Sequence, residues 1–282
     1  MSRRCADRIL TCLIYGSALL TVLLLVGMIG YVIYRGAGSV NWEFLTGVKS
    51  FLKGTEGIAG NIVNTLYMVI LTLLMAVPVG VGSAVYLNEY AGGGRFVRII
   101  EFTTEVLAGI PSIIFGLFGM IFFGATLGLG YSILTGALTL TLMILPLITR
   151  NTQEALKAVP DSYRQGALGM GCGKWYMIRT ILMPSAVPGI VTGIILATGR
   201  IVGESAALLF TAGSGYLLPK TAKALFTKIM EPGGTLTIEL YLNMSKAGYD
   251  TAFGIALVLL CIVFAMNLLT KFIMRGRKKV NA

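Results

Sequence analysis

The sequence predicts an all-α, polytopic membrane protein with six transmembrane helices. Of its 282 residues, 56% are hydrophobic and only 12% are charged, and the mean hydropathy is +0.82. Soluble domains carry about 25% charged residues, so one water-exposed globule could not hide this much apolar surface. Glycine contributes 36 residues, roughly twice its ordinary share, and close-packed membrane helices use glycine to let their backbones approach. The composition therefore indicates that lipid is the main solvent of the chain.

Six apolar runs are each long enough to cross a bilayer. They cover residues 9 to 34, 62 to 87, 99 to 124, 131 to 149, 184 to 211 and 250 to 273. The first run is expected to remain as a helix, because its apolar stretch is too long for a signal peptide and no small-residue cleavage site ends it. In the third run, Pro111 is expected to kink the helix.

The distribution of lysine and arginine predicts which helix ends face the cytoplasm. Fifteen of the 23 basic residues fall on one side: at the N-terminus, around Arg95, in the segment 150–184 and in the C-terminal tail. The positive-inside rule therefore places both termini and the segment 150–184 in the cytoplasm. Two long segments, 35–61 and 212–249, are then external. The second contains PKTAKALFTK, which is expected to form a short amphipathic helix on the membrane surface.

Several kinds of function are disfavoured by what the sequence lacks. It has no histidine, which excludes imidazole catalysis and histidine-ligated metal sites. Its carboxylates are scattered, its four cysteines show no metal-binding spacing, and it has no glycine-rich loop of the P-loop type. We therefore expect no metal, no cofactor and no catalytic residue. The net charge of +11 follows the membrane topology, so nucleic acid is not expected as a partner.

The segment DSYRQGALGMGCGKWYMIRTILMP, residues 161 to 184, is polar and structured between two apolar runs. Pro160 is expected to end the preceding helix, and a new short helix then runs through YRQGAL. It breaks in a glycine-rich turn that includes Gly171, and Pro184 is expected in the first turn of the fifth span. This pattern predicts a short helix parallel to the membrane, which a cytoplasmic partner could grip.

These residues resemble the EAA loop of importer-type ABC permeases. The matching positions are Gln165, Gly166, Ala167, Gly171, Ile181, Met183 and Pro184. Gln165 replaces the family's Glu, Gly166 its first Ala, and Met183 its Leu, while the spacing is kept. In that family the loop forms a coupling helix that docks in a groove of the ATP-hydrolysing subunit. The alternative is an ordinary cytoplasmic loop rich in turn residues.

Further stretches are similar to the A-type permeases of phosphate importers, among them VYLNEYA, EVLAGIPSIIFGLFG and GRIVGESAALLFTAG. The resemblance implies a type I importer permease in a bacterial or archaeal cytoplasmic (inner) membrane, with no ATP hydrolysis of its own. It also implies a C-type sister permease in a heterodimer, an ATPase homodimer on the cytoplasmic side and an external phosphate-binding protein. Residues 1–60 match less specifically and form a first helix and external loop. Residues 61–274 form the transmembrane domain with the coupling loop 160–184, and 275–282 a basic cytoplasmic tail.

Charged residues within the spans are the candidates for the substrate path. Arg200 is expected in the fifth span, with Glu204 on the same face four residues later. An arginine at mid-membrane costs about 2.5–3.5 kcal/mol on insertion scales, so it must face water or a partner. Its planar fork suits phosphate oxygens, so Arg200 is expected to meet the anion while Glu204 holds it. A buried structural ion pair is the alternative.

Arg150, at the inner end of the fourth span, is a weaker candidate that either guides the anion out or anchors the helix at the interface. Two GxxxG spacings, at 189 and 193 and at 199 and 203, predict close helix contacts. Two other functions remain open on the residues alone: transport of another oxyanion such as sulfate or molybdate, and an intramembrane enzyme.

Overall fold

The computed structural model describes residues 3–50, 55–92, 94–218, 224 and 227–278. Three long helices form the centre of the bundle: α3 (Ala59–Val85), α6 (Ile133–Lys157) and α9 (Met183–Gly203). Their buried side chains make one hydrophobic core, which includes Met68, Leu140 and Ile144. A fourth long helix, α13 (Tyr249–Lys278), packs against α9 and α1.

Five of the six predicted spans are confirmed as membrane-length apolar helices; the third is a bent pair of helices, and the fifth starts earlier than predicted. Five helices are long and apolar enough to cross a membrane: Asp7–Gly36, Ala59–Tyr90, Ile133–Lys157, Lys174–Gly203 and Tyr249–Phe272. The third predicted span is a pair of helices, Arg95–Gly109 and Ser112–Thr126, which meet at 101° and make a sixth span if the pair crosses as one. Pro111 therefore does more than kink this span: α4 (Arg95–Gly109) stops, and α5 (Ser112–Gly119) starts afresh after it. A proline donates no N–H and disfavours a helical residue before it, which accounts for the break.

The fifth span begins ten residues before its predicted start. Helix α8 (Lys174–Met177), the π-helical segment η3 (Ile178–Leu182) and α9 form one continuous helix, so Pro184 lies inside it. Pro184 lies in the first turn of α9, as expected, but the span that contains α9 starts ten residues before it, at Lys174. The π-helical turn directly before Pro184 explains how the helix continues, since such local widening re-satisfies the backbone groups that a proline leaves unpaired.

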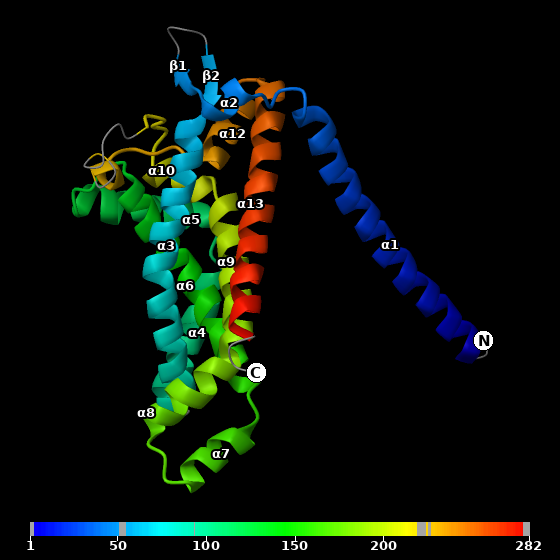
Figure 1. The fold of residues 1–282 in the computed structure, drawn as a ribbon, viewed down its shortest axis with the longest axis vertical. Helices are drawn as coiled ribbons and strands as arrows, with labels where there is room; N and C mark the ends of the chain where they lie inside the picture. Colours follow the sequence, from blue (N-terminus) through cyan, green and yellow to red (C-terminus); the bar gives the residue numbers. More distant parts are fainter. Residues whose placement is uncertain (1–2, 51–54, 93, 219–223, 225–226, 279–282) are drawn as a thin grey trace.

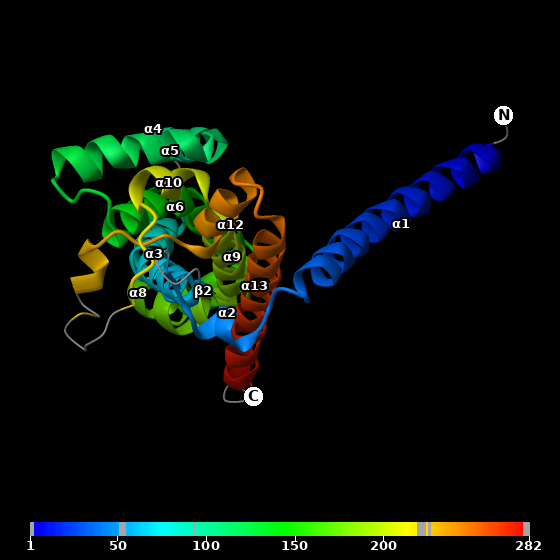
Figure 2. The same cartoon turned by 90° about the horizontal axis from the view of Figure 1, so that it is seen from above.

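Helix α1 (Arg3–Gly36) stands away from the bundle (Figures 1 and 2). Its residues are exposed from Asp7 to Tyr31. Near its C-terminal end it contacts α13, where an added Cβ at Gly36 would lie 2.5 Å from the carbonyl oxygen of Phe253. The helix is thus a predominantly apolar rod that joins the bundle at one end.

Short elements cover the end of the bundle to which α1 is joined. They are α2 (Trp42–Thr46), β1 (Val48–Ser50), β2 (Thr55–Ile58), α10 (Ala206–Thr211), η4 (Lys228–Met230) and α12 (Leu236–Ser245). The antiparallel strands pair Val48 with Ile58, and Lys49 forms an ion pair with Glu239 of α12. The amphipathic helix expected in PKTAKALFTK falls largely outside the described residues.

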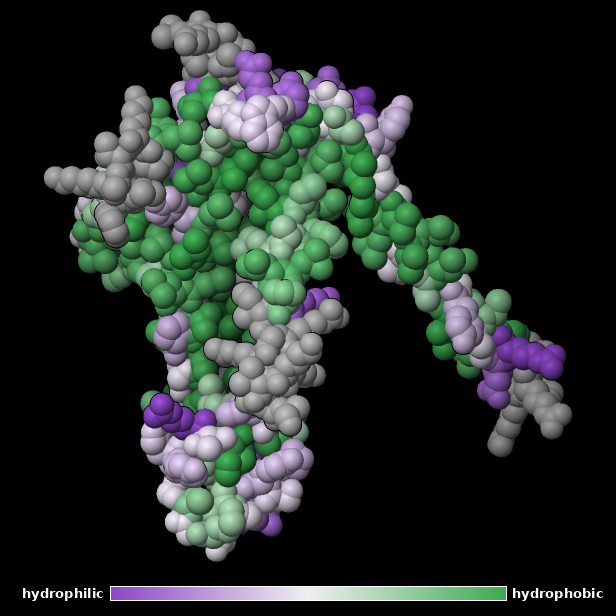
Figure 3. Space-filling view, in the orientation of Figure 1, coloured by the Kyte–Doolittle hydropathy of each residue, from purple (hydrophilic) through white to green (hydrophobic). Residues whose placement is uncertain are grey.

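The opposite end of the bundle carries α7 (Asp161–Gly169) and, on the same side, the N-terminal end of α1 and the C-terminal end of α13 (Figure 1). Hydrophobic side chains cover the middle of the bundle and much of α1, whereas polar side chains gather at the two ends (Figure 3). This banding matches a protein that crosses a bilayer with its long helices. The N-terminal end of α1 and the C-terminal end of α13 lie on the same side as α7, and which side faces the cytoplasm stays a prediction from the charge distribution.

Candidate functional site

Helix α7 is held in place by defined structure at both of its ends. It starts directly after Pro160, whose backbone is extended (φ −55°, ψ 139°). At the other end the N–H of Cys172 donates to the carbonyl of Ala167 (3.1 Å), and the N–H of Gly171 donates to that of Leu168 (3.0 Å). This pair of bonds is a Schellman motif, and it requires a left-handed residue at the position of Gly171. Gly171 has φ +78°, so the positive φ follows from its role as the helix stop.

The two sides of α7 differ sharply in exposure. Gln165 and Gly166 are exposed, as is Met170 just beyond the helix at 77%. Ala167 is only 2% exposed and packs in a hydrophobic cluster with Met177. Of the residues matched to the EAA pattern, Gln165 and Gly166 therefore lie on the free surface, whereas Ala167 faces the protein itself. Ala167 therefore positions α7 from below and is not part of its free surface.

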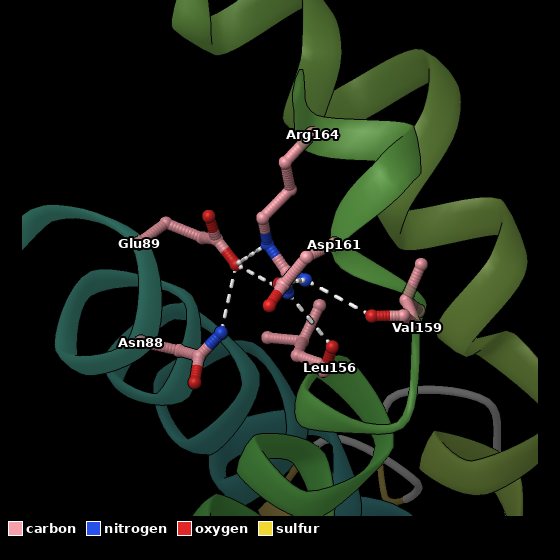
Figure 4. Close-up of polar contacts among 6 residues, drawn as sticks. All are labelled: Asn88, Glu89, Leu156, Val159, Asp161 and Arg164. Atoms are coloured by element: carbon pink, nitrogen blue, oxygen red, sulfur yellow. Dashed lines mark hydrogen bonds and ion pairs between the residues drawn. The ribbon is translucent and has the colours of Figure 1, made fainter. Parts of the chain in front are cut away.

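Arg164 ties the buried side of α7 to the rest of the bundle (Figure 4). Its Nη2 donates to Glu89 Oε1 (3.0 Å) and to the carbonyl of Leu156 (2.8 Å). Its Nη1 donates to the carbonyl of Val159 (3.0 Å) and to Asp161 Oδ1 (2.9 Å). The guanidinium thus joins the start of α7 to the end of α6 and to another helix. A cation at the free carbonyls of a helix end is also favoured by the helix dipole.

Glu89 belongs to the π-helical segment η1 (Tyr86–Tyr90), which extends α3. Its side chain is 5% exposed, and it accepts a further bond from Asn88 Nδ2 (2.7 Å). Arg164 is 18% exposed, so this is a largely buried, hydrogen-bonded ion pair. Removing one partner of such a pair leaves the other charge uncompensated and typically costs about 3–5 kcal/mol.

Sequence reasoning missed the pairing of Glu89 with Arg164. The two residues are 75 positions apart, and no local periodicity connects them. The available signal was a carboxylate at the polar end of an apolar run, in VYLNEYA, which requires a cationic partner if it is buried.

Arg200 lies at the opposite end of the span from α7, in the last turn of α9. It lies within the fifth span, as expected, three residues before the helix ends at Gly203. Glu204 is already extended (φ −80°, ψ 124°), and its carboxylate accepts from the N–H of Ala207 at the start of α10 (3.1 Å). The expected placement of Glu204 on the same helical face as Arg200 is therefore wrong.

The side chain of Arg200 is exposed and forms no ion pair with any residue that the structure describes. Gly199 and Gly203, on either side of Arg200 along the helix, leave the surface around its side chain open. An added Cβ at either glycine meets no described atom within 4 Å. The first GxxxG pair behaves differently. An added Cβ at Gly189 would lie 2.5 Å from that of Ala155, and one at Gly193 2.7 Å from that of Asn151. The predicted close contact is thus confirmed for Gly189 and Gly193, against α6.

Arg150 lies near the α7 end of α6 and is partly exposed. It forms ion pairs with Glu105 of α4 and with Glu154 one turn further along α6 (3.6 Å). These contacts link α4 to the α7 end of α6. No group of three or more Cys, Asp or Glu side chains suited to a metal is present in the described parts of the chain.

Residues 76–276, most of the chain, match the family model described as "Binding-protein-dependent transport system inner membrane component". The chain belongs to this family of importer permeases. As such a permease it is a multi-pass membrane component of an ABC importer and is not itself catalytic. Membership implies an ATPase partner and a substrate-binding protein.

Similar proteins extend over nearly the whole permease. It is 34% identical to "Probable ABC transporter permease protein YqgI" of Bacillus subtilis (strain 168), over 97% of this chain and 96% of that one. It is also 34% identical to "Phosphate transport system permease protein PstA" of Mycobacterium leprae (strain TN), over 94% of this chain and 88% of that one.

Solved transporters share the fold of the permease at low identity. A chain of the bacterial alginate ABC transporter, solved with its alginate pentasaccharide-bound periplasmic protein, matches with a TM-score of 0.72 and 16% identity, over 97% and 96% of the two chains. A chain of the MetNI methionine ABC transporter, in an inward-facing conformation, matches with a TM-score of 0.62 and 19% identity, over 78% of this chain and 95% of that one. The predicted importer-permease architecture is thereby confirmed.

Proposed function

We propose that this permease is the A-type membrane subunit of a phosphate importer. The observation that carries the proposal is its 34% identity, over 94% of its length, to a protein named as a phosphate transport system permease. The fold alone does not select a cargo, since transporters of alginate and methionine share it. The intramembrane enzyme considered from the sequence is set aside, because the membrane subunits of this family are not themselves catalytic.

In this proposal Arg200 meets the anion at the end of the path away from α7. Its support is an exposed guanidinium, without an ion-pair partner among the described residues, on a helix face that Gly199 and Gly203 leave open. A guanidinium binds phosphate oxygens through two parallel N–H groups, which a lysine cannot reproduce. Glu204 contributes by fixing the start of α10, whose Ala207 N–H donates to its carboxylate. Arg150 is a second, weaker candidate near the other end, where Glu105 and Glu154 already neutralise it.

The exposed side of α7 is the proposed docking surface for an ATPase homodimer. Gln165 and Gly166 supply surface that a partner reaches, while Ala167 and Gly171 set the position and the end of the helix. The α7 end and both termini then lie in the cytoplasm, as the basic residues indicate. The division into residues 1–60, the transmembrane domain 61–274 with the loop 160–184, and the tail 275–282 belongs to the same proposal.

Transport of another oxyanion is the second candidate, because the name of the YqgI protein specifies no cargo. The test is uptake of labelled phosphate into proteoliposomes that hold this permease, its C-type sister, the ATPase and the binding protein encoded beside it. Phosphate uptake that needs ATP and resists an excess of sulfate and molybdate supports the proposal. Uptake of labelled sulfate or molybdate without uptake of phosphate contradicts it.

A further inference from the structure

We propose that Glu89 and Arg164 lock helix α7 to the end of the second span, so that a displacement of α7 moves α3 and α9 together. Arg164 and Glu89 are positioning residues in this scheme, since neither lies on the exposed side of α7. The transmission step rests on the proposed function, because it takes α7 as the surface on which the ATPase acts. The lock itself does not depend on the identity of the cargo.

Chain connectivity alone would not make α7 move with α3. Helix α7 is joined to α6 through the extended backbone of Pro160, and to α8 through the left-handed Gly171 and the extended Gly173. Two such non-helical links would let α7 tilt independently of the spans. A contact outside the backbone is needed for α7 to transmit a force to the second span.

The guanidinium of Arg164 supplies that contact. Nε (3.3 Å) and Nη2 (3.0 Å) both reach Glu89 Oε1 on η1, while Nη1 and Nη2 also hold the carbonyls of Val159 and Leu156. One planar, rigid group therefore connects three segments, with each of its three nitrogens engaged. Because Glu89 is 5% exposed, solvent cannot replace Arg164 as its partner. Hydrogen bonds between charged groups are the strong ones, so a rigid connection is expected here.

A second contact fastens η1 to the start of the fifth span. The Nζ of Lys174 lies 5.0 Å from the centre of the Tyr90 ring, within the range of a cation–π interaction. Two consecutive residues of η1 are therefore contacted from two helices: Glu89 by Arg164 of α7, and Tyr90 by Lys174 of α8.

A hydrophobic cluster fills the space between these polar contacts. Its buried members are Leu156, Val159, Ala167, Met177, Ile178, Leu182, Ala186 and Ile190, with Val81 and Val85 of α3 packed against it. The cluster draws side chains from α3, α6, α7 and the fifth span into one packed body. Packed interiors transmit displacement rather than absorb it, so α7 and the ends of both spans are expected to shift as a unit.

The first test measures the lock in the full-length chain without any partner. Native cysteines are replaced, and spin labels are placed at the exposed positions Tyr163 on α7 and Tyr86 on η1. The parent should give one narrow distance distribution, and Glu89→Gln a broader one with a shifted mean. Asp161→Asn is the matched control, because this other carboxylate on Arg164 is 82% exposed and is expected to leave the distribution unchanged. A parental distribution in Glu89→Gln overturns the lock.

The second test measures transmission in the reconstituted four-component transporter. Glu89→Gln and Arg164→Lys should lower the cargo moved per ATP hydrolysed by about tenfold, in the range of typical coupling between sites, while ATP hydrolysis persists. If the two residues act as one unit, the double variant should be no worse than either single variant. The transmission step is overturned if the cargo moved per ATP hydrolysed equals that of the parent. It is also overturned if ATP hydrolysis and transport fall by the same factor. The ratio is measured for whichever anion is transported, so failure of the phosphate assignment is seen separately.

Discussion

The glycine that ends α7 allows a backbone effect to be separated from a packing effect. Gly171 has φ +78°, whereas Gly173, two residues later, has an ordinary φ of −65°. An added Cβ at either position meets no described atom within 4 Å. Gly171→Ala and Gly173→Ala therefore differ in backbone strain alone.

The expected magnitude follows from the left-handed conformation at Gly171. An L-residue there places its Cβ too close to the following carbonyl oxygen, which costs about 1–2 kcal/mol. Alanine at residue 173 fits its φ and ψ without strain and should be neutral or slightly stabilising, because it restricts the unfolded chain. A cost of 1–2 kcal/mol corresponds to a roughly 5–30-fold change in an opening equilibrium.

The equilibrium for local opening of this turn can be measured by hydrogen exchange with mass spectrometry, on peptides covering residues 161–173. The amides of Gly171 and Cys172 close the Schellman turn, so they should exchange about 5–30-fold faster in Gly171→Ala. Gly173→Ala should exchange like the parent. Parental exchange in Gly171→Ala, or equal acceleration in both variants, would refute the assignment of the turn to a left-handed glycine.

Three further predictions concern the buried and open faces of the helices. Ala167→Glu should lower the amount of folded chain in the membrane, because it places an unpaired carboxylate in the hydrophobic cluster beneath α7. Gln165→Arg, on the exposed side, should keep the chain level and weaken binding of the ATPase in a pull-down. A normal chain level for Ala167→Glu would contradict this prediction. Arg200→Ala should abolish most labelled-phosphate uptake at a normal level of assembled complex, and Arg200→Lys should rescue it in part; uptake like that of the parent in Arg200→Ala would remove this residue from the path. Gly189→Leu should lower the yield of folded chain, because the added side chain would clash with α6. Gly199→Leu should leave the yield unchanged, because its surroundings are open. Equal yields of the two variants would show that the contact of Gly189 with α6 is not tight.

The position of the long helices could be predicted because each depends on local composition. A run of some twenty apolar residues specifies a span wherever it occurs, and all six runs are helical, although the helix of the first run stands away from the bundle. The glycine-rich turn after α7 could also be predicted, since a glycine after a short polar helix is a common stop signal, and the structure adds that Gly171 is left-handed.

The misplaced features depend on contacts between distant segments. The start of the fifth span at Lys174 could not be predicted, because KWYMIRTIL is polar enough to suggest a segment at the membrane interface. Its buried residues Met177 and Ile178 nevertheless pack on other helices. The residue type at Ala167 does not indicate whether it lies on a docking surface or faces the protein interior, since alanine is suited to both. Glu204 was placed by assuming an unbroken helix, and its engagement with Ala207 follows from the start of a new one.

The π-helical turns also affect how relatives of this chain should be aligned. Segments Tyr86–Tyr90, Met120–Thr126 and Ile178–Leu182 each contain bonds that reach back five residues rather than four. Each such turn holds one residue more than the α-helical ladder needs, and every side chain beyond it is rotated by about 100° relative to an uninterrupted helix. A relative that lacks one residue within Ile178–Leu182 can therefore keep the same face toward α6 by closing the turn to an α-helix. A single-residue gap at that point in an alignment marks a change in helix winding, and the residues on either side of it remain in register in space.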